Sequence, residues 1–189
     1  MLAGCTKEEA IIYGLTVSGL VIRTPEVAWF YIGAFSDHPR EFVTYKILRM
    51  KGDILTKGQL QLLGLRSNSK ISKQFYETLS DEGLSDPLES AVTIAVSISN
   101  AVCTRHDVHR LVAAMGPNQL LRVEPSRMAA GPCAEAIRLS QSQSKASEAI
   151  LFPLQGCDKR GQCACRWSLG SMCLDDMNHE PVPYRLSLE

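Results

Sequence analysis

The stretch DPLESAVTIAVSISNAVCT, residues 86–104, decides the fold, because it predicts one long and mostly apolar helix. Asp86 is a favourable N-cap and Pro87 fits the first helical turn. Two stripes then follow at helical spacing. The apolar stripe is Leu88, Ala91, Val92, Ala95, Ile98 and Val102, and the polar stripe is Thr93, Ser97, Asn100 and Thr104. A helix this apolar belongs in a core, either of a monomer or of a dimer.

The segments around this stretch predict further helices. Thr6 and Glu9 have the spacing of a capping box ahead of AIIYGLTVSGLVI, although the Val, Ile and Thr content of that run also fits a strand. Pro25 takes the first helical position of an apolar segment. Residues 106–115 predict another helix that stops at Gly116, which is a good C-terminal signal.

After Gly116 the pattern changes. NQLLRVEPSRM predicts a strand that runs into a turn at Pro125, and GPCAEAIRL predicts a short helix with Pro132 near its start. The Ser- and Gln-rich run at 140–148 has no packing face, so we expect a loop or hinge there. Short strands, turns and cysteines are expected beyond it.

The predicted fold class is therefore mainly α, and α+β overall. A helical domain is expected over 1–116 and a cysteine-rich C-terminal region with a metal knuckle over 117–189, with the boundary between 117 and 130. The chain of 189 residues, 45% hydrophobic, suffices for one medium domain. Twenty basic and twenty acidic residues give zero formal charge, which excludes a globally basic nucleic-acid binder but not a local basic patch.

No apolar run approaches the roughly 18–20 residues that a membrane span requires, so no membrane partner is expected. Leu-Ala-Gly-Cys at 2–5 matches a lipoprotein motif, but that motif works only after a charged region and an apolar stretch, and only Met1 precedes it here. We therefore interpret the tetrapeptide as accidental and expect a cytoplasmic protein.

Three of the seven cysteines lie in GCDKRGQCACRW, residues 156–167. Cysteines separated by one residue point to the same face of an extended segment, and the two glycines allow tight backbone turns. The basic residues Lys159, Arg160 and Arg166 would offset thiolate charge. A structural zinc site needs four soft ligands, so one more is required. The candidates are Cys133 and Cys173, with His179 as a weaker one.

This arrangement resembles the C-terminal tail of a group of small uncharacterised bacterial proteins, over roughly a fifth of the chain. In place of the Asp-Arg-Arg run that follows the aromatic residue in that group, this chain has SLGSMCLDDM. The resemblance implies a fourth ligand at Cys133 and implies no activity. The matching residues are Cys133, Pro153, Leu154, Gly156, Cys157, Cys163, Cys165 and Trp167.

The predicted ligands of one structural Zn²⁺ are thus Cys133, Cys157, Cys163 and Cys165. Two other interpretations stay open at this point. Four cysteines also pack as small apolar side chains, and closely spaced cysteines beside basic residues are easily oxidised.

Residues 55–79 resemble a helix-turn-helix, with a first helix ending at Gly64 and a second beginning at Ser69. They overlap a stretch from Arg40 to Lys73 that has eight basic and two acidic residues. Any pair of packed amphipathic helices gives the same pattern, which is the alternative. The predicted nucleic-acid contacts are Arg66, Asn68, Lys70, Lys73 and Gln74.

His106 and His109 are one helical turn apart, so both could bind a metal on one helix face with Asp107 nearby. No third ligand can be assigned, and a polar helix surface is the favoured interpretation. Phosphate loops, nucleophile elbows and zinc-hydrolase motifs are absent from the sequence. We therefore predict a non-catalytic zinc-binding interaction or regulatory protein. Its candidate partners are DNA or RNA, another protein, or a second copy of the chain. The alternative is a metal- or thiol-dependent enzyme that uses the two histidines or the cysteine cluster.

Overall fold

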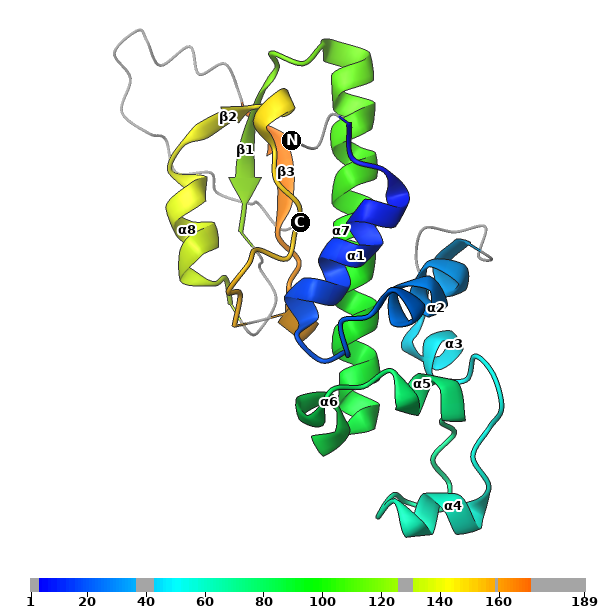
Figure 1. Ribbon diagram of the computed structural model, residues 1–189. Helices are drawn as coiled ribbons and strands as arrows, with labels where there is room; N and C mark the ends of the chain where they lie inside the picture. Colours follow the sequence, from blue (N-terminus) through cyan, green and yellow to red (C-terminus); the bar gives the residue numbers. More distant parts are fainter. Residues whose placement is uncertain (1–3, 37–42, 126–130, 159, 171–189) are drawn as a thin grey trace, which may run out of the picture.

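Helix α7 (Pro87–Met115) is the central element of the computed structural model, which describes residues 4–36, 43–125, 131–158 and 160–170. Figure 1 shows α7 as the longest helix, with α1 along one side, the sheet along another and α4 beyond its first turn. The Asp86 carboxylate accepts hydrogen bonds of 3.1 Å from the backbone N–H groups of Leu88 and Glu89, as predicted for its N-cap.

The two helices predicted on either side of residue 105 are one continuous helix of 29 residues. No glycine or proline stands between Pro87 and Gly116 to interrupt it. The helix ends where predicted, at Gly116, whose φ of 88° is a conformation that glycine adopts without strain.

Helix α1 (Lys7–Ser18) begins with the predicted capping box: the Thr6 side chain accepts from the Glu9 N–H at 3.1 Å, and the Glu9 carboxylate accepts from the Thr6 N–H at 2.7 Å. The strand alternative for this segment is therefore wrong. Gly14 lets α1 lie directly against α7, because a Cβ atom at this position would stand 2.6 Å from the Ile98 Cα.

Shorter helices complete the N-terminal part. They are α2 (Pro25–Ser36), which begins at Pro25 as predicted, α3 (Tyr45–Arg49), α4 (Lys57–Leu62), α5 (Lys73–Glu77) and α6 (Asp81–Ser85). A serine or threonine side chain caps the first turn of each of the last four. The capping residues are Thr44, Thr56, Ser72 and Ser80.

A three-stranded antiparallel sheet follows α7. Its central strand β1 (Leu120–Glu124) lies between β2 (Gln143–Lys145) and β3 (Arg166–Leu169), and Leu121 pairs with Ser144 on one side and Leu169 on the other. The strand predicted before Pro125 is confirmed. The loop predicted at 140–148 is wrong in part, because β2 and a 3-10 turn, η2 (Ala146–Glu148), lie within it. Strand β2 lies at the edge of the sheet and is held by backbone hydrogen bonds to β1. It needs no apolar face, so its polar sequence does not identify it as a strand.

Helix α8 (Ala134–Ser140), predicted after Pro132, packs on β1, while α7 contacts β3 and a second 3-10 turn, η3 (Arg160–Gln162). The mainly α, α+β fold class is therefore confirmed. No helix in the described parts of the chain is both long and apolar enough to cross a membrane.

Buried apolar residues form two clusters. The main core surrounds α7 and contains side chains from the N-terminal helices, such as Ile11, Phe35 and Phe75, together with Leu121 and Leu151 from the C-terminal region. A second and smaller cluster contains Cys133, Cys157, Cys163 and Cys165.

Candidate functional site

The four cysteines predicted as metal ligands lie in one buried cluster, which we call the cysteine cluster. Cys133, Cys157, Cys163 and Cys165 are only 7%, 2%, 5% and 7% exposed. They come from three segments: the N-cap of α8, the turn that follows Leu154, and the link between η3 and β3. The fold therefore brings these thiols together from separate parts of the chain.

The remaining buried members of the cysteine cluster are few: Val123, Ala136, Phe152 and Leu154. Trp167 covers its edge, with its ring 5.7 Å from that of Phe152 and its indole N–H donating to the Ile150 carbonyl at 2.9 Å. Half of the buried residues here are thus cysteines, so the cluster has much less apolar surface than the main core.

The Cys163 thiol lies beside Cys165 inside the cluster. A hydrogen bond with Cys165 and burial both raise the pKa of Cys163 well above the ordinary thiol value. No disulfide joins the cysteines of the described residues. Across those same residues, no three His, Cys, Asp or Glu side chains stand together in the arrangement of a metal-ligand set.

The polar stripe of α7 holds the cysteine loop in place. The Asn100 side-chain amide donates to the Cys163 carbonyl. Gly161 lies so close to α7 that a Cβ atom there would stand 2.7 Å from the Thr93 hydroxyl oxygen. The stripe therefore contacts the C-terminal element. Sequence reasoning identified the stripe but gave no signal of its partner.

The two glycines of this loop have different roles. Gly156 has a φ of 79° and so makes the tight turn expected of it, whereas Gly161 is required by its contact with α7. The Arg166 guanidinium pairs with the Glu124 carboxylate at 2.7 Å. Lys159, Cys173 and His179 lie outside the described residues.

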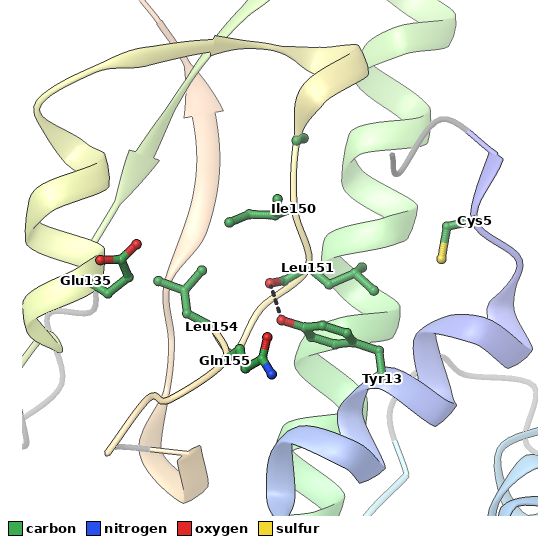
Figure 2. Close-up of a pocket in the computed structure, with 8 residues that line it drawn as sticks. Cys5, Tyr13, Glu135, Ile150, Leu151, Leu154 and Gln155 are labelled. Carbon is green, nitrogen blue, oxygen red and sulfur yellow. Dashed lines mark hydrogen bonds between the residues drawn. The ribbon is translucent and has the colours of Figure 1, made fainter.

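A cavity of about 440 Å³ lies beside the cysteine cluster, between α1, α8 and the segment 149–155. Figure 2 shows Tyr13 reaching across it from α1 toward Leu151. The Tyr13 hydroxyl lies 3.4 Å from the Leu151 carbonyl oxygen and 3.1 Å from that of Pro153. Burial, together with the nearby thiols of Cys157 and Cys163, raises the pKa of Tyr13. Nothing in the apolar run around Tyr13 marked it for this position.

The predicted helix-turn-helix segment forms a different structure, which we call the basic arm, residues 54–72. Ile54 and Ser72 pair as an antiparallel bridge at its base, and the Leu55 N–H donates to the Ile71 carbonyl at 2.9 Å. Figure 1 shows α4 at the far end of the arm, away from α7.

The second helix predicted from Ser69 is wrong. Helix α5 begins only at Lys73 and has five residues, because residues up to Ser72 are in extended pairing with the start of the arm. The first predicted helix is α4, and Gly64 turns the chain after it with a φ of 70°, as expected.

The predicted nucleic-acid contacts consequently separate into two groups. Arg66, Asn68 and Lys70 are exposed on the returning part of the arm. The other two lie on α5, where Lys73 pairs with Glu77 at 3.7 Å and the Gln74 amide donates to Asp53 at 2.8 Å. Only the first group is on the arm itself.

His106 and His109 are half-buried on the second half of α7. In the parts of the chain that the structure describes, neither belongs to a group of three side chains arranged to hold a metal ion. The described structure therefore gives no support to the alternative of a metal-dependent enzyme that uses these two histidines.

No protein-family model matches this chain, and comparison with curated proteins and with solved structures finds no significant similarity. Any functional argument must therefore rest on the cysteine cluster and the basic arm.

Proposed function

We propose that this is a non-catalytic interaction protein in which one structural zinc ion, bound by Cys133, Cys157, Cys163 and Cys165, fastens the C-terminal element, and in which the basic arm binds nucleic acid. The observation that carries the zinc proposal is the burial of four thiols from three segments in a single small cluster.

Zinc suits this chemistry because four cysteine thiolates are a common tetrahedral ligand set of structural sites. Each thiol gives up its proton when it binds the metal, so the proposed site would form with release of protons. Rotation about the Cα–Cβ bond moves a cysteine sulfur from one staggered position to another without moving the backbone.

The place of the cluster in the fold supports a structural role. Cys133 stands at the start of α8, and the Cys163 backbone is bound to Asn100 of α7. A metal that joins these cysteines would link α8, the turn at Cys157 and the approach to β3. These metal–thiolate bonds would provide the stabilisation that a larger apolar core provides elsewhere in the molecule.

The zinc proposal is tested by elemental analysis of protein purified under reducing conditions after growth with added zinc. We expect about one zinc per chain for the tetrahedral four-thiolate site, and a loss of at least half of it in Cys133→Ser. Cys103→Ser is the matched control, because Cys103 is on α7 outside the cluster, and it should keep the wild-type zinc content. Folded wild-type protein without bound zinc would overturn the proposal.

The nucleic-acid proposal rests on the charge of the basic arm. Lys57, Arg66 and Lys70 lie within residues 54–72, which include no Asp or Glu. Serine, asparagine and glutamine side chains of the arm are further donors to phosphate oxygens. The arm thus carries a local positive charge on a chain of zero net charge.

Binding to a labelled DNA duplex over a range of salt concentrations tests this part. We expect affinity to fall with salt and the slope to shrink by about 2 in Arg66→Glu/Lys70→Glu, since each phosphate contact contributes roughly 0.9. Lys145→Glu, an exposed charge on β2 remote from the arm, is the control and should retain most of the binding. Absence of wild-type binding at low salt would contradict the proposal.

A further inference from the structure

Leu62, at the end of α4 on the basic arm, is 88% exposed, more than any other large apolar side chain in the described parts of the chain. Its neighbour Leu63 is 40% exposed. Exposure of this extent on an ordered helix leaves an apolar group free to enter a partner.

The arm holds Leu62 in a defined position. Leu60, on the same short helix, is only 1% exposed and belongs to the main core cluster together with Leu55 and Ile71. The Leu65 N–H donates to the Leu60 carbonyl at 2.8 Å, which closes the turn after α4. One face of the helix is thus packed into the arm, while Leu62 points away from it.

The chemistry around Leu62 defines the partner. The arm combines this leucine with Lys57, Arg66 and Lys70 and has no carboxylate. Duplex DNA has the complementary arrangement, with phosphates outside and an apolar base stack between them. Proteins of several folds enter that stack with an apolar wedge such as leucine and bend the duplex.

Two features exclude other ways of reading nucleic acid. The arm has no Phe, Tyr or Trp, so it lacks the aromatic platform on which unpaired bases stack. Helix α5 has only five residues and is too short to lie along a major groove as a recognition helix.

We propose that Leu62 is a wedge that inserts between base pairs of double-stranded DNA and bends it, while Arg66 and Lys70 contact the flanking phosphates. This inference rests on the nucleic-acid binding proposed above and adds its mode. It also implies little sequence specificity, because a wedge and phosphate contacts read deformability rather than base edges.

The test measures bending of an end-labelled 20-base-pair duplex by energy transfer, alongside affinity, for wild type and Leu62→Ala. We expect the wild type to bend the duplex and Leu62→Ala to abolish the bend, to weaken binding about tenfold and to keep the salt slope. Ile137→Ala, an apolar side chain 46% exposed on α8, is the control and should behave as wild type. The melting temperature of Leu62→Ala should equal that of the wild type, since this side chain is not packed in the core.

The outcomes separate the two proposals. No wild-type binding to DNA would overturn both. Wild-type binding with an equal bend and equal affinity in Leu62→Ala would overturn the wedge alone. Leu62-dependent binding to anionic lipid vesicles, or Leu62-dependent self-association, in protein that does not bend DNA would overturn it in favour of that other partner.

Discussion

The main core and the cysteine cluster are two buried regions of one molecule that differ in the types of side chain they contain. The main core has aliphatic and aromatic side chains from α1, α2, α5 and α7, among them Ile98 and Phe35 with no exposed surface. The cysteine cluster has four cysteines among eight buried residues. The main core is therefore stabilised mainly by apolar burial, whereas we propose that metal binding to the thiols stabilises the smaller cluster.

The largest expected effect follows removal of the proposed zinc ion from the cysteine cluster. Binding to structural zinc sites contributes on the order of 10 kcal/mol in small domains, and the cluster has little apolar surface to replace it. We expect a strong chelator to raise amide hydrogen exchange across residues 131–170 while α1 and α7 stay protected. Equal exchange with and without the chelator would show that both regions are stabilised in the same way.

A substitution in the main core should lower the unfolding free energy equally with and without added metal. Gly14→Ala places a Cβ atom 2.6 Å from the Ile98 Cα, so α1 must move away from α7, at a cost of about 1–3 kcal/mol. Gly58→Ala is the matched control, because a Cβ atom there meets nothing within 4 Å. Denaturant unfolding checks both variants. A Gly14→Ala protein as stable as Gly58→Ala would contradict the described contact between the two helices.

The decrease in unfolding free energy at alkaline pH depends on Tyr31, a residue of the main core. Burial raises the pKa of Tyr31, and its hydroxyl lies 2.8 Å from the Thr78 hydroxyl. The folded state therefore retains the phenol proton after the unfolded chain begins to lose it. The resulting stabilisation is present below about pH 10 and is lost as pH rises further.

Tyr31→Phe should cost about 1 kcal/mol at neutral pH, since it removes one buried hydrogen bond, and should flatten the decline in unfolding free energy above pH 10. Urea unfolding at several pH values measures both effects. An alkaline decline as steep as that of the wild type would show that Tyr31 is not the group responsible.

The smallest effect on stability is expected in the basic arm. Arg66→Glu/Lys70→Glu changes two exposed charges, so the unfolding free energy should stay within about 0.5 kcal/mol of the wild type. A larger loss would mean that these side chains support the fold, and weakened DNA binding by the variant would then need another explanation.

Local signals predicted much of the helical part correctly. The capping box at Thr6, Pro25 at a helix start and the N-cap at Asp86 each act within one turn, so the sequence nearby is sufficient to identify them. Pairing between distant segments could not be predicted in this way. The edge strand β2 and the bridge between Ile54 and Ser72 depend on partners far away in the sequence.

In the candidate site too, contacts between segments far apart in the sequence were not predicted. Cys133 shares one buried cluster with the other three predicted ligands, and their binding of a metal is our proposal. The contact from Asn100 to the cysteine loop and the position of Tyr13 beside it were missed, since both depend on how α7 and α1 pack. The arm was misread because serine-rich segments such as 67–72 fit either a helix start or an extended strand.

The central claim is that the cysteine cluster is a metal centre of four thiolates. X-ray absorption at the zinc edge on purified wild-type protein tests it most directly. We predict a single shell of four sulfur ligands at about 2.3 Å, reduced to three in Cys133→Ser. Zinc bound mainly by nitrogen or oxygen, or a Cys133→Ser spectrum identical to that of the wild type, would contradict it.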